Sequence, residues 1–219
     1  MATSADILFS LFYEREGMMR SLFARAALIA GLAGMNMPVA VAGTIVPDAI
    51  GYTYNLDETD DAKICEIILD MQNPATPELV EFTAFAGYDK SNESVAIGFI
   101  TMAAHQPLSE ELQLLDLSAA TFTSPTFRSV NDMDYEVHKD GGIMAATLDR
   151  VAASNFLQAF IGGDFELTLA TAGPQSTNFS YKIYTAPPAE VQNGFARCLE
   201  DLLRPSLSLL HGAEDLTAL

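Results

Sequence analysis

Residues 65–71, CEIILDM, decide the fold class of this chain. Apolar residues occupy every second position of the stretch, and Glu66, Ile68 and Asp70 lie between them. Because successive side chains of a strand point to opposite faces, a period of two predicts a β-strand with one apolar face and one wetter face. We therefore expect a protein that is built around a β-sheet.

The same alternation recurs along most of the chain. Residues 95–103, VAIGFITMA, are almost wholly apolar, as in a central strand that is covered on both faces. Residues 133–137 and 143–148 flank the segment 139–142, KDGG, which favours a hairpin turn because glycine tolerates positive φ. Further strands are predicted at 80–84, 117–123, 165–169 and 179–183. The pattern predicts roughly six to eight strands.

Two segments have the spacing of helices instead. Residues 150–161, RVAASNFLQAFI, gather their apolar residues on one side, and the Gly162-Gly163 pair ends the pattern. Residues 187–203, PPAEVQNGFARCLEDLL, begin with a proline pair that suits a first helical turn, and Pro205 is expected to end this helix. Its apolar stripe consists of Val191, Phe195, Cys198, Leu199 and Leu202. The sequence thus predicts an α+β fold: a mainly antiparallel sheet, curved or folded into a sandwich, with the C-terminal helix packed on it and one further short helix.

Residues 18–42 have the layout of a cleaved secretory signal peptide. Two arginines precede an apolar run at 26–35, and small residues stand just before Gly43. The run is far shorter than the ~20 residues that span a bilayer. We therefore expect cleavage between Ala42 and Gly43, no stable membrane anchor after cleavage, and a periplasmic or extracellular location.

Residues 1–17 fit an export signal poorly, because they carry three acidic residues where such signals carry net positive charge. We interpret residues 1–17 as an over-extended start of the gene, and we expect translation to begin at Met18 or Met19. An alternative joins 7–35 into one membrane helix, in which each charged residue near the bilayer centre would cost up to ~3 kcal/mol.

The exported part is expected to form a single β-rich domain at 43–205, followed by a loosely ordered tail at 206–219. The chain has 29 acidic and 11 basic residues, a formal net charge of −18. This charge argues against nucleic acid, whose phosphates require basic residues, and against anionic membrane surfaces. It would attract a basic protein or a cation, and it also keeps an exported protein soluble.

The two cysteines of the chain lie on surfaces that need a partner. Cys65 is on the apolar face of a predicted strand, and Cys198 is on the apolar stripe of the last predicted helix. Because the expected compartment is oxidising, we predict a Cys65–Cys198 disulfide that pins the helix across the sheet. Two buried free thiols are the alternative. A catalytic role is disfavoured, because there is no CxxC motif and neither cysteine has a histidine beside it.

Metal-ligand types gather near the predicted hairpin. The candidates, which share one strand face if 132–138 is extended, are Asp132, Asp134, Glu136 and His138. Alternate residues of a strand lie ~7 Å apart, which is too far for all of them to share an ion, so we prefer a solvated strand face. Residues 55–66 mimic the spacing of a calcium loop but have Asp60 at the position that requires glycine. No metal or cofactor is predicted.

Motifs for hydrolysis or phosphate binding, such as GxSxG, HExxH and a Gly-rich phosphate loop, do not occur in the chain. An export signal, a β-rich body and a terminal helix with a cysteine are typical of small bacterial envelope proteins. We therefore expect a non-catalytic binding or scaffold protein that acts through a sheet face or strand edges. Two alternatives stay open: an acidic inhibitor or escort of a basic envelope enzyme, and a hydrolase with dispersed carboxylates and His138 or His105.

Overall fold

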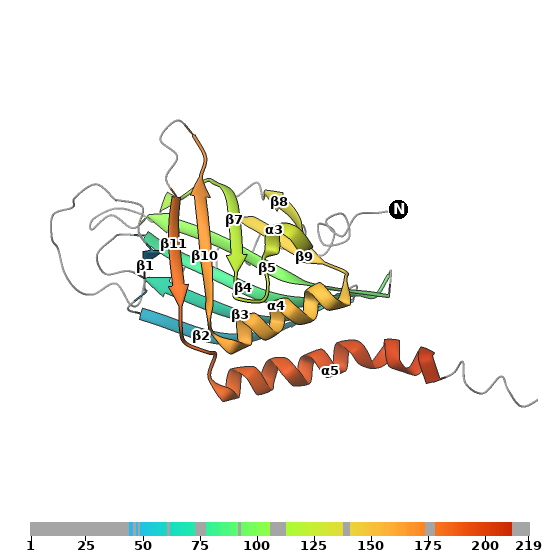
Figure 1. Ribbon diagram of the computed structural model, residues 1–219. Helices are drawn as coiled ribbons and strands as arrows, with labels where there is room; N and C mark the ends of the chain where they lie inside the picture. The colour runs from blue at the N-terminus through green and yellow to red at the C-terminus, as the bar shows by residue number, and fades with distance from the viewer. Residues whose placement is uncertain are drawn as a thin grey trace, which may run out of the picture.

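The computed structural model describes residues 44–211 except positions 46, 48, 61, 73–77, 92, 106–112, 138–140 and 174–177. The predicted signal peptide and its cleavage site between Ala42 and Gly43 lie outside the described residues. Within these limits the chain forms two β-sheets, with two long helices along one side of them (Figure 1). The described helices are α3 (Ser129–Asp132), α4 (Arg150–Gly162) and α5 (Ala189–His211).

The larger sheet has seven strands and the smaller sheet has four. The larger sheet contains β2 (Ala49–Glu58), β3 (Ala62–Gln72), β4 (Glu78–Asp89), β5 (Ser94–His105), β6 (Gln113–Leu114), β8 (Asp134–Val137) and β9 (Ile143–Thr147). The smaller sheet contains β1 (Thr44–Ile45), β7 (Leu117–Thr123), β10 (Phe165–Thr171) and β11 (Asn178–Ile183). The strand orders are β2-β3-β4-β5-β9-β8, with β6 beside β5, and β1-β11-β10-β7. Of the described pairings, only that of β1 with β11 is parallel, so the predicted α+β fold with a mainly antiparallel sheet is confirmed.

One apolar core joins the inner faces of the two sheets. The alternate apolar residues of 65–71 are buried in it, as predicted, but Glu66 and Ile68 on the other face of the strand are buried as well, so the expected wetter face is not observed at these two positions. A second, smaller buried apolar cluster, which includes Ile64 and Phe85, lies on that face. Phenylalanine rings pack at its centre: the ring centroid of Phe82 in the larger sheet lies 5.9 Å from that of Phe122 and 6.0 Å from that of Phe165, both in the smaller sheet. Since such ring pairs contribute ~0.5–1.5 kcal/mol beyond their buried area, the contacts between sheets are specific as well as apolar.

Helix α4 confirms the helix predicted at 150–161. The Asp149 carboxylate caps its start by accepting hydrogen bonds from two backbone N–H groups of the first turn, at 2.9 and 2.8 Å. Phe156 and Phe160 are completely buried and place this helix against the aromatic centre of the core. Gly163 ends the helix in the left-handed conformation, with φ of 70°, which glycine adopts without strain.

Helix α5 packs on the larger sheet through the predicted stripe. Val191, Phe195, Cys198 and Leu202 are buried, and Leu199 is half-buried against the same core. The helix contacts β2, β3 and β4, and in Figure 1 it runs alongside β2. The C-terminal helix is therefore placed on the sheet as expected.

The predicted end of this helix is wrong. Helix α5 continues past Pro205 to His211, and residues 212–219 of the predicted tail lie outside the described residues. Proline lacks an N–H and removes one bond of the helix, but its fixed φ near −65° is itself helical. A proline therefore weakens a helix at one point without being obliged to end it.

Strand β2 has no counterpart among the predicted strands. It pairs with β3 without interruption from Ala49 opposite Gln72 to Glu58 opposite Lys63. The segment 55–66, which mimics a calcium loop in spacing, is thus the turn between these two strands and the strand ends beside it. A calcium loop requires glycine at its sixth position, where this segment has Asp60, so its place between two strands agrees with the sequence.

Candidate functional site

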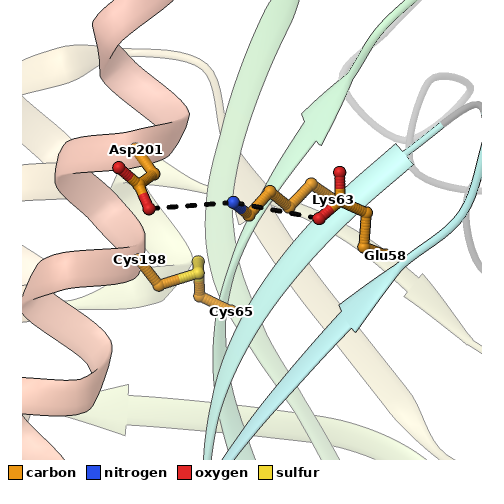
Figure 2. The surroundings of a disulfide bond; sticks show 5 residues. All are labelled: Glu58, Lys63, Cys65, Cys198 and Asp201. Carbon is orange, nitrogen blue, oxygen red and sulfur yellow. Dashed lines mark ion pairs between the residues drawn. A yellow bond between two sulfur atoms is a disulfide. The ribbon is translucent and has the colours of Figure 1, made fainter.

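A disulfide joins Cys65 of β3 to Cys198 of α5, as predicted, with their Cα atoms 6.0 Å apart (Figure 2). This distance lies within the ~4.4–6.8 Å that a disulfide requires. Both cysteines are buried. Lys63 lies beside the bond, with its Nζ atom 3.9 Å from the Asp201 carboxylate of α5 and 4.0 Å from the Glu58 carboxylate of β2.

These two ion pairs add little to the attachment of the helix. The carboxylates of Glu58 and Asp201 are about half exposed, and exposed pairs are worth ~0–1 kcal/mol. The covalent bond and the buried stripe therefore hold α5 in place. A buried disulfide of this kind is structural rather than catalytic.

The structure separates the predicted metal candidates. Asp134 and Glu136 alternate on β8, but Asp132 is the last residue of α3, and His138 lies outside the described residues. The condition for a shared face, an extended chain over 132–138, is therefore not met at Asp132. Among the described residues, no group of three or more histidine, cysteine, aspartate or glutamate side chains could hold a metal ion.

Buried Ser129 explains why α3 interrupts the extended chain. Its hydroxyl accepts hydrogen bonds from the backbone N–H of Phe122, at 2.9 Å, and from the hydroxyl of Tyr135. Both bonds draw the segment before β8 toward β7 and favour one helical turn there. The spacing of 132–138 holds no signal for these contacts, because they depend on which strand lies nearby.

His105, a candidate of the hydrolase hypothesis, lies at the end of β5 opposite Glu78 of β4. Its Nδ1 atom is 4.0 Å from the Glu78 carboxylate. Burial and then the charge of nearby Glu78 raise the pKa of Tyr181, whose buried hydroxyl has no hydrogen-bond partner among the residues that the structure describes. No hydrogen bond in the described part of the chain joins His105 to a serine, threonine or cysteine.

The face of β3 and β4 that points away from the main core is itself largely buried and carries an acidic group that the sequence did not reveal. Asp70 lies directly opposite Glu81, and Glu66 precedes Asp70 by four residues on the same face of β3. Glu81 is only 8% exposed. Burial, and then the charges of Asp70 and Glu66, raise the pKa of Glu81 to about 7, while a hydrogen bond with Thr83 partly offsets this rise.

Other contacts on this face order the cluster. The Asn55 side-chain amide of β2 donates a 2.8 Å hydrogen bond to the Glu66 carboxylate. Burial also raises the pKa of Asp70. Close carboxylates disfavour ionisation of one another, so the cluster can take up a proton near neutral pH. Only the pairing of β3 with β4 brings Asp70 and Glu81 together, and alternation within one strand could not have shown it.

The outer edge of β2 is the longest exposed strand edge in the described structure. All ten residues of β2 pair with β3, and no described strand pairs with its other side. Gly51 and Thr53 are exposed, and the Leu56 side chain is 46% exposed. The strand contains no proline, lysine or bulge, which are the usual features that protect an edge from pairing.

Comparison with known proteins finds no match: no family model, no curated protein and no solved structure is similar to this chain. No described helix combines the length and the apolar character needed to cross a membrane. Inference about function therefore depends on the exposed edge, the acidic charge, the buried disulfide and the contacts of the candidate residues.

Proposed function

We propose that this protein is exported to the periplasm or the medium and acts there as a non-catalytic binding or scaffold protein through the edge of β2. The single observation that carries this proposal is the ten-residue strand that pairs on one side only in the described structure. Its backbone N–H and C=O groups on the other side can pair with an extended segment of another protein.

The position of α5 favours an outer edge of β2 that can bind a partner. Helix α5 covers the core-facing side of β2, where the Tyr52 hydroxyl donates a 2.5 Å hydrogen bond to the backbone carbonyl of Thr185. The disulfide from the neighbouring strand β3 holds this helix, so β2 is supported from its inner side and from β3. A strand fixed in this way loses little conformational freedom when a partner binds.

Export is supported by the layout of residues 18–42 and by the buried disulfide, which persists in an oxidising compartment. The net charge of −18 favours a basic partner, and long-range attraction would speed its association at low salt. This charge is the observation that favours the second function, an acidic inhibitor or escort of a basic envelope enzyme.

A capture experiment tests the proposal. The exported form is immobilised and incubated with envelope extract at low and at high salt, and bound proteins are identified by mass spectrometry. Thr53→Lys adds a positive charge to the exposed edge, and Ser154→Lys adds the same charge to an exposed position of α4. We expect the wild type and Ser154→Lys to capture the same protein, and Thr53→Lys to lose it.

The salt series separates the two functions. Capture of one basic protein that is lost as salt rises supports the inhibitor or escort function, whereas capture that persists at high salt supports the scaffold function. Equal capture by the Thr53→Lys and Ser154→Lys variants would show that the β2 edge is not the binding element.

A further inference from the structure

The outer face of the four-stranded sheet is polar and regular. On the inner side of β7, β10 and β11, Phe122, Leu167 and Tyr181 are opposite one another and completely buried. The residues between them therefore point away from the core. In Figure 1 this sheet lies in front of the larger one, and neither α4 nor α5 passes in front of it.

A row of hydroxyl groups crosses this face. Thr168 of β10 lies directly opposite Thr121 of β7 on one side and Ser180 of β11 on the other, and all three are half-buried. The Thr168 and Ser180 hydroxyl oxygens are 2.7 Å apart and share one hydrogen bond. Because this bond uses one hydroxyl hydrogen, the row keeps two donors and several acceptor lone pairs for a ligand.

The adjacent row is close to neutral. Glu166 of β10 lies opposite Lys182 of β11, and the Lys182 Nζ atom is 2.8 Å from the Asp164 carboxylate. Its third member, Thr123, is uncharged. With Asp164 included, the named groups carry a formal charge of −1, from Glu166 and Asp164 against Lys182, whereas the chain as a whole carries −18.

An exposed aromatic ring stands at the end of this face. Tyr184 follows β11 and is 67% exposed, and the Lys182 Nζ atom lies 5.4 Å from the centre of its ring. The contact with Lys182 places the ring beside the second row. The face of an aromatic ring is electron-rich and attracts the C–H groups of a sugar ring, while hydroxyl rows exchange hydrogen bonds with sugar hydroxyls.

We propose that the outer face of β7, β10 and β11 binds an uncharged polysaccharide, with one sugar unit on Tyr184 and the chain across the row Thr121–Thr168–Ser180. The inference rests on the proposed binding function and names a ligand class for it. An anionic polymer would be repelled by the net charge of −18, and an apolar segment would leave the hydroxyl row without hydrogen bonds.

Affinity gel electrophoresis tests this proposal with the exported form and three soluble polymers. Hydroxyethyl cellulose and dextran are the uncharged probes, and alginate is the anionic one. We expect retardation by at least one uncharged polymer, a loss of about tenfold in affinity for Tyr184→Ala, and a loss of about fivefold for Thr121→Val with Thr168→Val. Ser154→Ala removes an exposed hydroxyl from α4, outside both proposed binding elements, and serves as the matched control, which should bind like the wild type.

Thermal melting of each variant checks that the sheet is intact. Absence of retardation by both uncharged polymers, retardation by alginate alone, or undiminished binding by the Tyr184 and threonine variants would overturn the proposal. These results leave the proposed function separately testable, because protein capture through the β2 edge uses the other sheet and the Thr53→Lys variant.

Discussion

Glu81 is held in an environment that favours its neutral form. It lies on β4 with 8% exposure and faces two further carboxylates, Asp70 and Glu66. Its pKa is raised from 4.5 to about 7, so the folded protein binds this proton more tightly than the unfolded chain does. The corresponding stability is present below pH ~4.5 and is lost as the pH rises through ~7.

Replacement of Glu81 by glutamine should remove this dependence. The free energy of unfolding of the wild type should decrease by about 3 kcal/mol between pH 4.5 and pH 8 through this group, which means that the protein becomes less stable. Glu81→Gln cannot ionise, so it should be more stable than the wild type at pH 8 and should show a flatter profile. Urea unfolding at each pH measures the effect. The exposed Glu200→Gln should keep the wild-type profile, and an unchanged slope in Glu81→Gln would contradict the expectation.

Gly194 has a packing reason to be a glycine, although it lies inside helix α5. A Cβ atom at this position would come within 2.9 Å of the Tyr54 ring of β2, which is closer than side chains tolerate. A Cβ at Gly162, near the end of α4, would have no neighbour within 4 Å. The first glycine allows a helix and a strand to approach each other, and the second has no such constraint.

These two glycines should respond in opposite ways to alanine. Gly162→Ala should leave the melting temperature unchanged or raise it, because alanine is favoured by ~1 kcal/mol inside a helix. Gly194→Ala should lower the melting temperature, because the clash with Tyr54 exceeds this gain. Differential scanning calorimetry measures the melting temperatures of both variants. Equal shifts in the two would show that the Tyr54 ring moves aside freely.

Helix α5 and strand β3 are joined over a sequence separation of 133 residues. The bond closes most of the domain into one loop, and the ion pairs of Lys63 beside it are too exposed to replace it. By the chain-entropy argument a loop of this size corresponds to roughly 4–5 kcal/mol of stability, less if the unfolded chain retains structure.

Reduction of the disulfide should therefore lower the melting temperature of the protein. The double variant Cys65→Ala with Cys198→Ala should melt at a similarly reduced temperature and should not respond to reductant. The wild type measured without reductant is the reference. If reduction leaves the wild-type melting temperature unchanged, the buried stripe of α5 alone holds the helix on the sheet.

The protein as a unit combines an acidic charge with two proposed binding elements, the edge of β2 and the outer face of the smaller sheet. Both the edge of β2 and the hydroxyl row of the smaller sheet face away from the core, on opposite sheets. The two proposed binding elements can therefore act independently. Their use depends on the compartment that the chain reaches.

Export should be visible in the mass of the purified protein. Cleavage between Ala42 and Gly43 predicts that the form in the periplasm or the medium begins at Gly43, and intact-mass spectrometry determines this directly. A product in the membrane fraction that retains residues 18–42 would contradict the cleaved signal and favour the membrane-helix alternative.

The period of two and the spacing of the helices were sufficient to predict most elements of this protein. Strands at 65–71, 95–103 and 165–169, the helix at 150–161 and the disulfide all follow from which side of an element is apolar. That information is local, because each face of a strand or helix must be buried or solvated as a unit. The prediction that the last helix ends at Pro205 was wrong, because one unfavourable residue was outweighed by the other residues of the helix.

Relations between elements were decided by tertiary structure. Whether β2 is an edge, whether Asp70 meets Glu81, and whether Thr121 and Ser180 flank Thr168 all depend on strand order and register. Each of these contacts joins residues that are distant in the chain, and alternation within one strand is compatible with many partners. The packing of the whole core selects one arrangement, and so the candidate surfaces exist only in the folded protein.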